Sequence, residues 1–161
     1  MAKIFRRRRG FTLVEVLVTT AIIAILAGAV LPMAKVALQR ERETDLERGL
    51  RAIREAIDDY KRLADDKKIE FDADTDGYPP TLDALVKGVK LKSDAKGKSS
   101  PDKIVKLLRR IPLDPMTNSR EWGLLSSQDA PDAASWGEQN VFEVYTKRRG
   151  KGLNGTKYRD W

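Results

Sequence analysis

The acidic residues between positions 70 and 85 form the pattern in this sequence that most suggests metal chemistry. They follow the opening D-x-D-x-D-G of an EF-hand calcium loop, with an acid at its twelfth position, and are Asp72, Asp74, Asp76 and Asp83. The match is partial, because the twelfth ligand of such a loop is normally Glu and two prolines interrupt this one. An acidic turn leading into a short helix capped by Thr81 explains the same residues. We expect no cofactor, and calcium stays open here as the weaker interpretation.

The composition excludes several kinds of catalysis. The 161 residues include neither Cys nor His, so the chain has no thiolate nucleophile, no disulfide, no imidazole base and no zinc site that contains His. No spacing among the remaining acids singles out a general acid/base pair, and no P-loop or Gly-x-Ser-x-Gly motif is present. The sequence therefore predicts a protein that is not an enzyme.

The elements that must position the remaining residues begin with a membrane segment. Lys3 and the four arginines at 6–9 stand before residues 16–34, which are uncharged and mostly Ala, Val, Leu and Ile. That run matches the ~20 residues a helix needs to span a bilayer core. Lys and Arg on one flank hold that flank in the cytoplasm. We expect a cytoplasmic N-terminus, with the bulk of the chain outside the cytoplasm.

Two simple interpretations of this segment leave one residue unexplained. A secretory signal would be cut after Ala27-Gly28-Ala29, before Val30, and Arg8-Arg9 permits a twin-arginine version. A plain uncleaved anchor is the second interpretation. Neither accounts for Glu15, because an acid inside a lipid-spanning helix costs about 2.5 to 3.5 kcal/mol at the centre and less near the end.

A third interpretation comes from a resemblance. Residues 9–15, with the sequence RGFTLVE, resemble the class III leader junction of type IV pilins and of type II secretion pseudopilins. The resemblance implies that a prepilin peptidase cuts between Gly10 and Phe11 and methylates the new amine of Phe11. It also implies that Glu15 pairs with that amine of a neighbouring subunit in a filament, which would compensate a charge that is costly alone in hydrocarbon. A Glu15 that snorkels to the membrane interface is the alternative.

Beyond the membrane segment the helical pattern continues to about Ala64. Pro32 is expected to kink the helix rather than stop it. An apolar stripe then recurs at steps of three and four, through Leu46, Leu50, Ile53, Ile57, Tyr60 and Leu63. Two short helices, from Leu82 and after Asp102, flank a Lys-rich connection at 87–103, and strands follow at 121–126 and 141–146. The pattern predicts an α+β, pilin-like fold in which the long helix, transmembrane and then amphipathic, packs on a small antiparallel sheet.

The C-terminal third extends the resemblance to nearly the whole chain. Its segments are similar to conserved-looking Pro-x-Asp-Pro, Trp-Gly, Phe-Asp-Val-Tyr and Gly-x-x-Tyr-x-x-Trp stretches of major (G-type) pseudopilins, and lie at 112–115, 122–123, 142–145 and 155–161. One departure matters. Calcium-binding relatives of this type have acids in the loop after the last strand, where this chain has Lys147-Arg148-Arg149. Because such charges repel Ca²⁺, the calcium site that the resemblance implies is not carried over, and the loop is either held by packing of Tyr158 and Trp161 or mobile.

The same basic loop permits a nucleic-acid interpretation. Six bases stand near three aromatic side chains, a mixture that can hold single strands. Residues 11–161 carry 26 bases against 24 acids, a near balance that makes nucleic acid an unfavoured partner.

The sequence as a whole predicts a filament subunit. We expect a cleaved leader at 1–10, a transmembrane and assembly helix at 11–35, and a periplasmic head at 36–161. The resemblance implies a homopolymer anchored in the bacterial inner membrane, served by prepilin peptidase, a platform protein, an assembly ATPase and minor pseudopilins. A secretion pseudopilus is the main prediction, and a type IV pilus or DNA-uptake filament stays open as the alternative.

Overall fold

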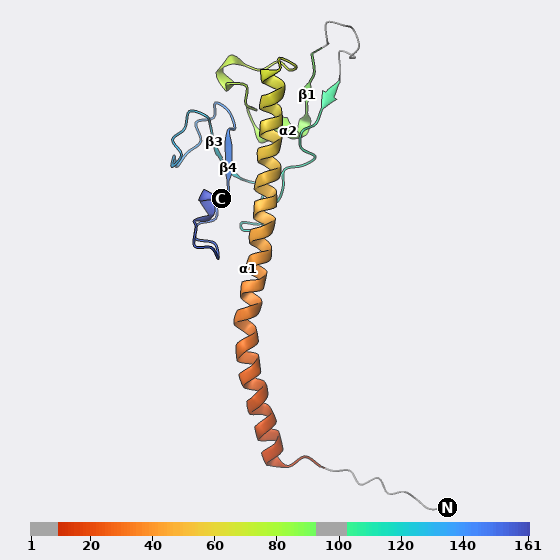
Figure 1. Cartoon of the computed structure of the whole chain (residues 1–161), viewed down its shortest axis with the longest axis vertical. Coiled ribbons are helices and arrows are strands. Elements are labelled where there is room, and N and C mark those ends of the chain that lie inside the picture. The colour runs from red at the N-terminus through yellow and green to blue at the C-terminus, as the bar shows by residue number, and fades with distance from the viewer. Residues whose placement is uncertain (1–9, 93–102) are drawn as a thin grey trace, which may run out of the picture. The chain divides into compact units, whose positions relative to one another are not determined.

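The computed structural model describes residues 10–92 and 103–161, which form two compact units that divide between Gln39 and Arg40. The leader before Gly10, Asp102 and most of the Lys-rich connection lie outside the described residues. One element, α1 (Leu13–Asp65), belongs to both units (Figure 1).

The first unit is the N-terminal part of α1. The helix begins two residues later than Phe11 because Thr12 caps it: the Thr12 hydroxyl accepts a hydrogen bond from the N–H of Glu15 at 3.2 Å. Thr19 and Thr20 donate their hydroxyls to backbone oxygens of the preceding turn, which satisfies them within the helix. The helix continues through Pro32, as predicted.

The second unit is built around the apolar stripe of α1. Five of its six predicted members are buried, namely Leu46, Leu50, Ile53, Ile57 and Tyr60, and Leu63 is partly buried against them. The remaining core side chains come from later segments, among them Leu82, Leu85, Trp122, Val141 and Val144. The amphipathic half of α1 is therefore the central element of this unit, as the spacing predicted.

After α1 the elements are short. They are η1 (Ala73–Thr75), α2 (Leu82–Lys87), β1 (Val89–Lys90), β2 (Ile104–Val105), β3 (Gly123–Leu125), β4 (Glu143–Tyr145) and η2 (Tyr158–Asp160). The strands form two separate two-stranded antiparallel sheets, β1 with β2 and β3 with β4. The α+β prediction is confirmed, with two small sheets where one was expected.

The helix predicted after Asp102 is wrong. Ile104 and Val105 pair as β2 with β1, in the register Val89 with Val105. After Lys106, the N–H groups of Leu107 and Leu108 both donate to the backbone oxygen of Leu85, at 3.1 and 3.0 Å. The backbone thus finds its partners on neighbouring segments, which the β-branched pair Ile-Val favours over a helix.

Two glycines allow aromatic side chains to pack closely. A Cβ on Gly49 of α1 would lie 3.4 Å from the ring of Trp122, whose indole N–H donates to the backbone oxygen of Pro112 at 3.0 Å. A Cβ on Gly123 would lie only 2.3 Å from the ring of Tyr145, its partner across β3 and β4. The Tyr145 ring therefore occupies the space that a side chain at position 123 would need.

Candidate functional site

The predicted processing junction is open to a partner. Among the described residues nothing lies within 4 Å of where a Cβ of Gly10 would be, and Phe11 is 79% exposed. Both residues precede the first turn of α1, outside regular helix. The predicted cleavage bond between Gly10 and Phe11 therefore lies outside the helix.

Glu15 lies in the first turn of α1 and is exposed. No hydrogen bond or ion pair of its carboxylate is formed with any residue in the described parts of the chain. The carboxylate is thus available to a group from outside the chain.

The apolar residues around Glu15 have no cover within the first unit. Leu13, Val14, Leu17, Ile23, Ile25 and Leu26 are each more than 60% exposed. By length and composition this part of α1 could cross a membrane. An apolar surface of this extent needs lipid or the equivalent helix of another subunit to cover it.

Thr12 is a functional residue of this site that the sequence analysis missed. It fixes where α1 begins and so sets the position of Glu15, whose N–H it binds. The pattern Thr-x-x-Glu, which opens a capping box, was the available signal.

The four calcium candidates do not come together. Asp72 precedes η1 in extended backbone, and the left-handed pair Asp76 and Gly77 closes the turn. The Asp76 carboxylate accepts a hydrogen bond from the Ser127 hydroxyl at 3.0 Å, and Asp83 lies in the first turn of α2. No group of three metal-binding side chains forms among the residues that the structure describes. The segment forms a turn followed by the short helix α2, with Thr81 at the N-cap position but without the side-chain capping hydrogen bond that was expected.

A second polar arrangement fastens the C-terminal segment to α1. Glu43, which is 8% exposed, accepts hydrogen bonds from the Tyr158 hydroxyl at 2.8 Å and from the N–H of Leu153 at 3.0 Å. The rings of Tyr158 and Trp161 meet edge to face at 5.2 Å. The structure thus shows the packing of Tyr158 and Trp161 that was one of the two alternatives, while residues 147–151 of the loop are exposed.

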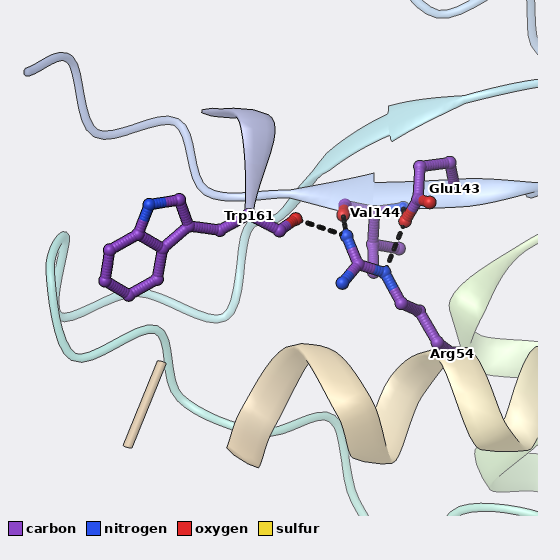
Figure 2. A network of polar contacts seen from close by, with 4 residues as sticks. All are labelled: Arg54, Glu143, Val144 and Trp161. Carbon is purple, nitrogen blue, oxygen red and sulfur yellow. Dashed lines mark hydrogen bonds and ion pairs between the residues drawn. The ribbon is translucent and has the colours of Figure 1, made fainter. Parts of the chain in front are cut away.

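Arg54 ties the same segment to β4, as Figure 2 shows. Its Nε donates to the Glu143 carboxylate at 2.7 Å, and its Nη2 donates to the backbone oxygens of Val144 at 3.4 Å and Trp161 at 2.5 Å. One guanidinium thus joins α1, a strand and the C-terminal segment, which a planar fork of donors can do and an ammonium cannot. Neither Arg54 nor Glu43 was singled out from the sequence, because both look like ordinary charges on the polar face of a helix.

A basic cavity of about 490 Å³ opens beside this segment. It is lined by Tyr145, Thr146 and Gly150 and by six bases, which are Lys147, Arg148, Arg149, Lys151, Lys157 and Arg159. The buried Asp114 fixes the start of the loop by accepting a hydrogen bond from the Thr146 hydroxyl at 2.6 Å. The Arg159 guanidinium stacks over the Tyr145 ring at 4.7 Å.

Comparison with known proteins bears on both ends of the chain. Residues 5–31 match the family described as "Prokaryotic N-terminal methylation motif". Over 122 residues the chain is 30% identical to the "Type II secretion system core protein G" of Pseudomonas aeruginosa, covering 73% of this chain and 74% of that protein. The chain is a type II secretion pseudopilin. It belongs to the G-type group of that family.

No solved structure gives a significant match to this pseudopilin. Its methylation-motif match includes Gly10, Phe11 and Glu15, the three residues that the sequence placed at the processing and assembly site. Its core-protein relative is a component of a secretion system, which favours the secretion pseudopilus over the surface pilus or uptake filament that the sequence left open. The printed name of the relative is that of a core protein of a secretion system and gives no enzymatic activity.

Proposed function

We propose that this pseudopilin is stored as a single-pass protein of the bacterial inner membrane and then polymerised into a secretion pseudopilus. Residues 1–10 would be the cleaved leader, 11–35 the transmembrane and assembly helix, and 36–161 the head. The five basic residues among the first ten favour a cytoplasmic N-terminus and a periplasmic head.

The observation that carries the proposal is the Glu15 carboxylate, which has no partner among the described residues and lies in the first turn of an exposed apolar helix. A charge at this position is costly in hydrocarbon unless it is paired. A prepilin peptidase would cut between Gly10 and Phe11 and methylate the amine of Phe11. That amine in one subunit would then pair with Glu15 of the next, while the apolar faces of residues 11–35 pack together.

The chain carries no nucleotide-binding motif that could drive assembly. We propose that an assembly ATPase acts through an inner-membrane platform protein, and that minor pseudopilins join the same filament. No metal is proposed as a resident cofactor: the acids at 72, 74, 76 and 83 lie apart, and the loop at 147–151 is basic.

The test is the mature N-terminus of the protein from the membranes of its host. Intact mass and N-terminal sequencing should find a chain that starts at methylated Phe11. A start at Val30 would overturn the proposal, because the apolar helix would then be discarded as a signal peptide.

A substitution separates cutting from assembly. Glu15→Val should leave the cut intact and abolish filaments, because the helix remains apolar and loses only the partner for the amine. Glu41→Val is the matched control, since it removes another exposed acid of α1 outside the assembly segment and should leave filaments unchanged. Normal filaments from the Glu15→Val protein would contradict the pairing.

A further inference from the structure

The basic cavity holds like charges against one another. Lys151 and Lys157 stand directly opposite in an antiparallel bridge. Like charges in such cross-strand pairs are destabilising. Of the six bases that line the cavity, Lys147 alone forms an ion pair within the described residues, with Glu121 at 3.6 Å. A cavity in which so few of the positive charges pair with acids of the same chain is suited to bind an anionic group from outside.

The backbone keeps this arrangement in place. The N–H of Gly152 donates to the backbone oxygen of Thr156 at 2.8 Å, and the N–H of Tyr158 donates to that of Gly150 at 3.2 Å. The buried Glu43 then fastens both sides of the loop, through Leu153 and Tyr158. The two lysines therefore cannot relieve their repulsion by loop movement without breaking these bonds.

The chain itself carries a matching anionic surface. We name residues 65–76 the acidic segment, which has six acids against two lysines. Three of those acids, Glu70, Asp72 and Asp74, are exposed and make no side-chain hydrogen bond or ion pair within the described parts of the chain. Glu70 and Asp72 also line a hollow of about 430 Å³.

The two surfaces lie at opposite ends of the second unit, measured along α1. The loop that bears the basic cavity is bonded to Glu43, near the start of this unit, whereas the acidic segment begins at Asp65, where α1 ends. These positions differ by 22 residues, or about 33 Å of helix at ~1.5 Å per residue. One copy of the chain cannot satisfy its own cavity over that distance, but a neighbour displaced along the helix direction can.

We propose that the basic cavity of one copy receives the acidic segment of the next. Lys151 and Lys157 would be neutralised by carboxylates of that segment, with Glu70 and Asp74 as the exposed candidates. Two different surfaces at opposite ends of the head make a heterologous contact, which produces a helical filament when the rotation between neighbours does not close into a ring. The inference rests on the proposed function, and adds to it a contact between heads, separate from the packing of residues 11–35.

A charge exchange in the full-length chain tests the contact. Lys151→Glu with Lys157→Glu should reduce the yield of sheared filaments about tenfold, and Glu70→Lys with Asp74→Lys should do the same, because like charges then face each other. All four substitutions in one chain should restore the yield, since the pairs are opposite in charge again. Lys106→Glu and Asp132→Lys are matched controls, exposed and outside both surfaces, and should have no effect.

Crosslinking gives a second test that does not depend on charge. The chain contains no Cys, so Asp74→Cys with Lys151→Cys introduces the two reactive thiols and no others. A bis-maleimide should join them into a ladder of dimers, trimers and longer species. Neither single variant should form a ladder, because one thiol per chain can at most make dimers.

The outcomes separate this contact from the function it rests on. A chain that is not cut and forms no filaments would contradict the proposed function. If chains are cut correctly but their filaments form no crosslinked ladder, and if the charge exchange does not change the yield of filaments, the head contact alone is overturned. The head contact would also be overturned if the parent chain bound single-stranded DNA and the Lys151→Glu, Lys157→Glu protein did not, while filaments were unchanged. The basic cavity would then be a nucleic-acid site.

Discussion

The carboxylate of Glu43 on α1 accepts a hydrogen bond from the hydroxyl of Tyr158, at an oxygen–oxygen distance of 2.8 Å, across 115 positions of the sequence. Glu43 is buried and also accepts the N–H of Leu153. An acid from the long helix therefore orders the loop that carries the basic cavity.

We expect Glu43→Ala to destabilise the head by about 1 to 3 kcal/mol, because the Tyr158 hydroxyl and the Leu153 N–H lose an acceptor in a buried site. The measurement is thermal unfolding of the full chain in detergent micelles, followed by near-ultraviolet circular dichroism. Glu41→Ala removes an exposed acid two positions earlier and should change little. Equal stability of the two variants would contradict the role of Glu43.

We expect Arg54→Lys to loosen the C-terminal segment, because an ammonium cannot reach Glu143, Val144 and Trp161 at once as the guanidinium does. The side chain is partly exposed, so the loss should be modest, about 1 kcal/mol. Faster amide exchange at 158–160 is the readout. Arg51→Lys, on an exposed arginine one turn away, is the control, and a similar change in both variants would refute the role of Arg54.

Two glycine substitutions should act in opposite directions. Gly123→Ala should cost about 1 to 3 kcal/mol, because its Cβ would lie 2.3 Å from the Tyr145 ring. Gly49→Ala should be neutral or stabilise the head by up to about 1 kcal/mol, since its Cβ meets Trp122 at an ordinary 3.4 Å and alanine favours helix. Urea unfolding of both variants and of the parent chain measures whether each substitution lowers or raises the free energy of unfolding.

The turn after β3 should be sensitive to acid. The Asp129 carboxylate accepts hydrogen bonds from the N–H groups of Ser126 at 2.7 Å and Gly137 at 3.0 Å, and these lower the pKa of Asp129 below its ordinary value. A lowered pKa stabilises the folded turn at pH values above the ordinary pKa, and the stabilisation is lost as pH falls through the lowered one.

We therefore expect protection of the Ser126 and Gly137 amides from hydrogen exchange to fall in strong acid and to be constant near neutrality. Asp129→Asn should weaken the protection at neutral pH and remove the acid-dependent step. Asp132→Asn, on a nearby exposed acid, should retain that step. A parent chain with no acid-dependent loss would contradict the prediction.

The parts of the fold that were predictable are those set by local periodicity. The stripe from Leu46 to Tyr60 fixed the buried face of α1, and the alternation at 141–146 placed β4 to within two residues. The segment after Asp102 was misjudged because its apolar residues fit a helix as well as a strand. Its structure was decided by β1 and by the backbone oxygen of Leu85, partners remote in the sequence.

The residues predicted for processing and assembly, Gly10, Phe11 and Glu15, stand together in one short segment, and their roles stay predictions. Arg54 and Glu43 were not predictable, because their importance arises from contacts 89 to 115 positions away. The basic cavity was visible as a cluster of charges. The bridge that sets Lys151 against Lys157 was not, because it depends on how the loop folds back on itself.

The bonds from α1 to the C-terminal segment also determine when the head can fold. They join residues 107 to 115 positions apart, so they form only after nearly the whole chain has been synthesised. Contacts of such long sequence separation slow folding, because much chain entropy is lost before they form. Until then the apolar stripe of α1 lacks part of its cover and is open to proteases and chaperones. We therefore expect nascent chains that stop before Tyr158 to be degraded rather than stored in the membrane.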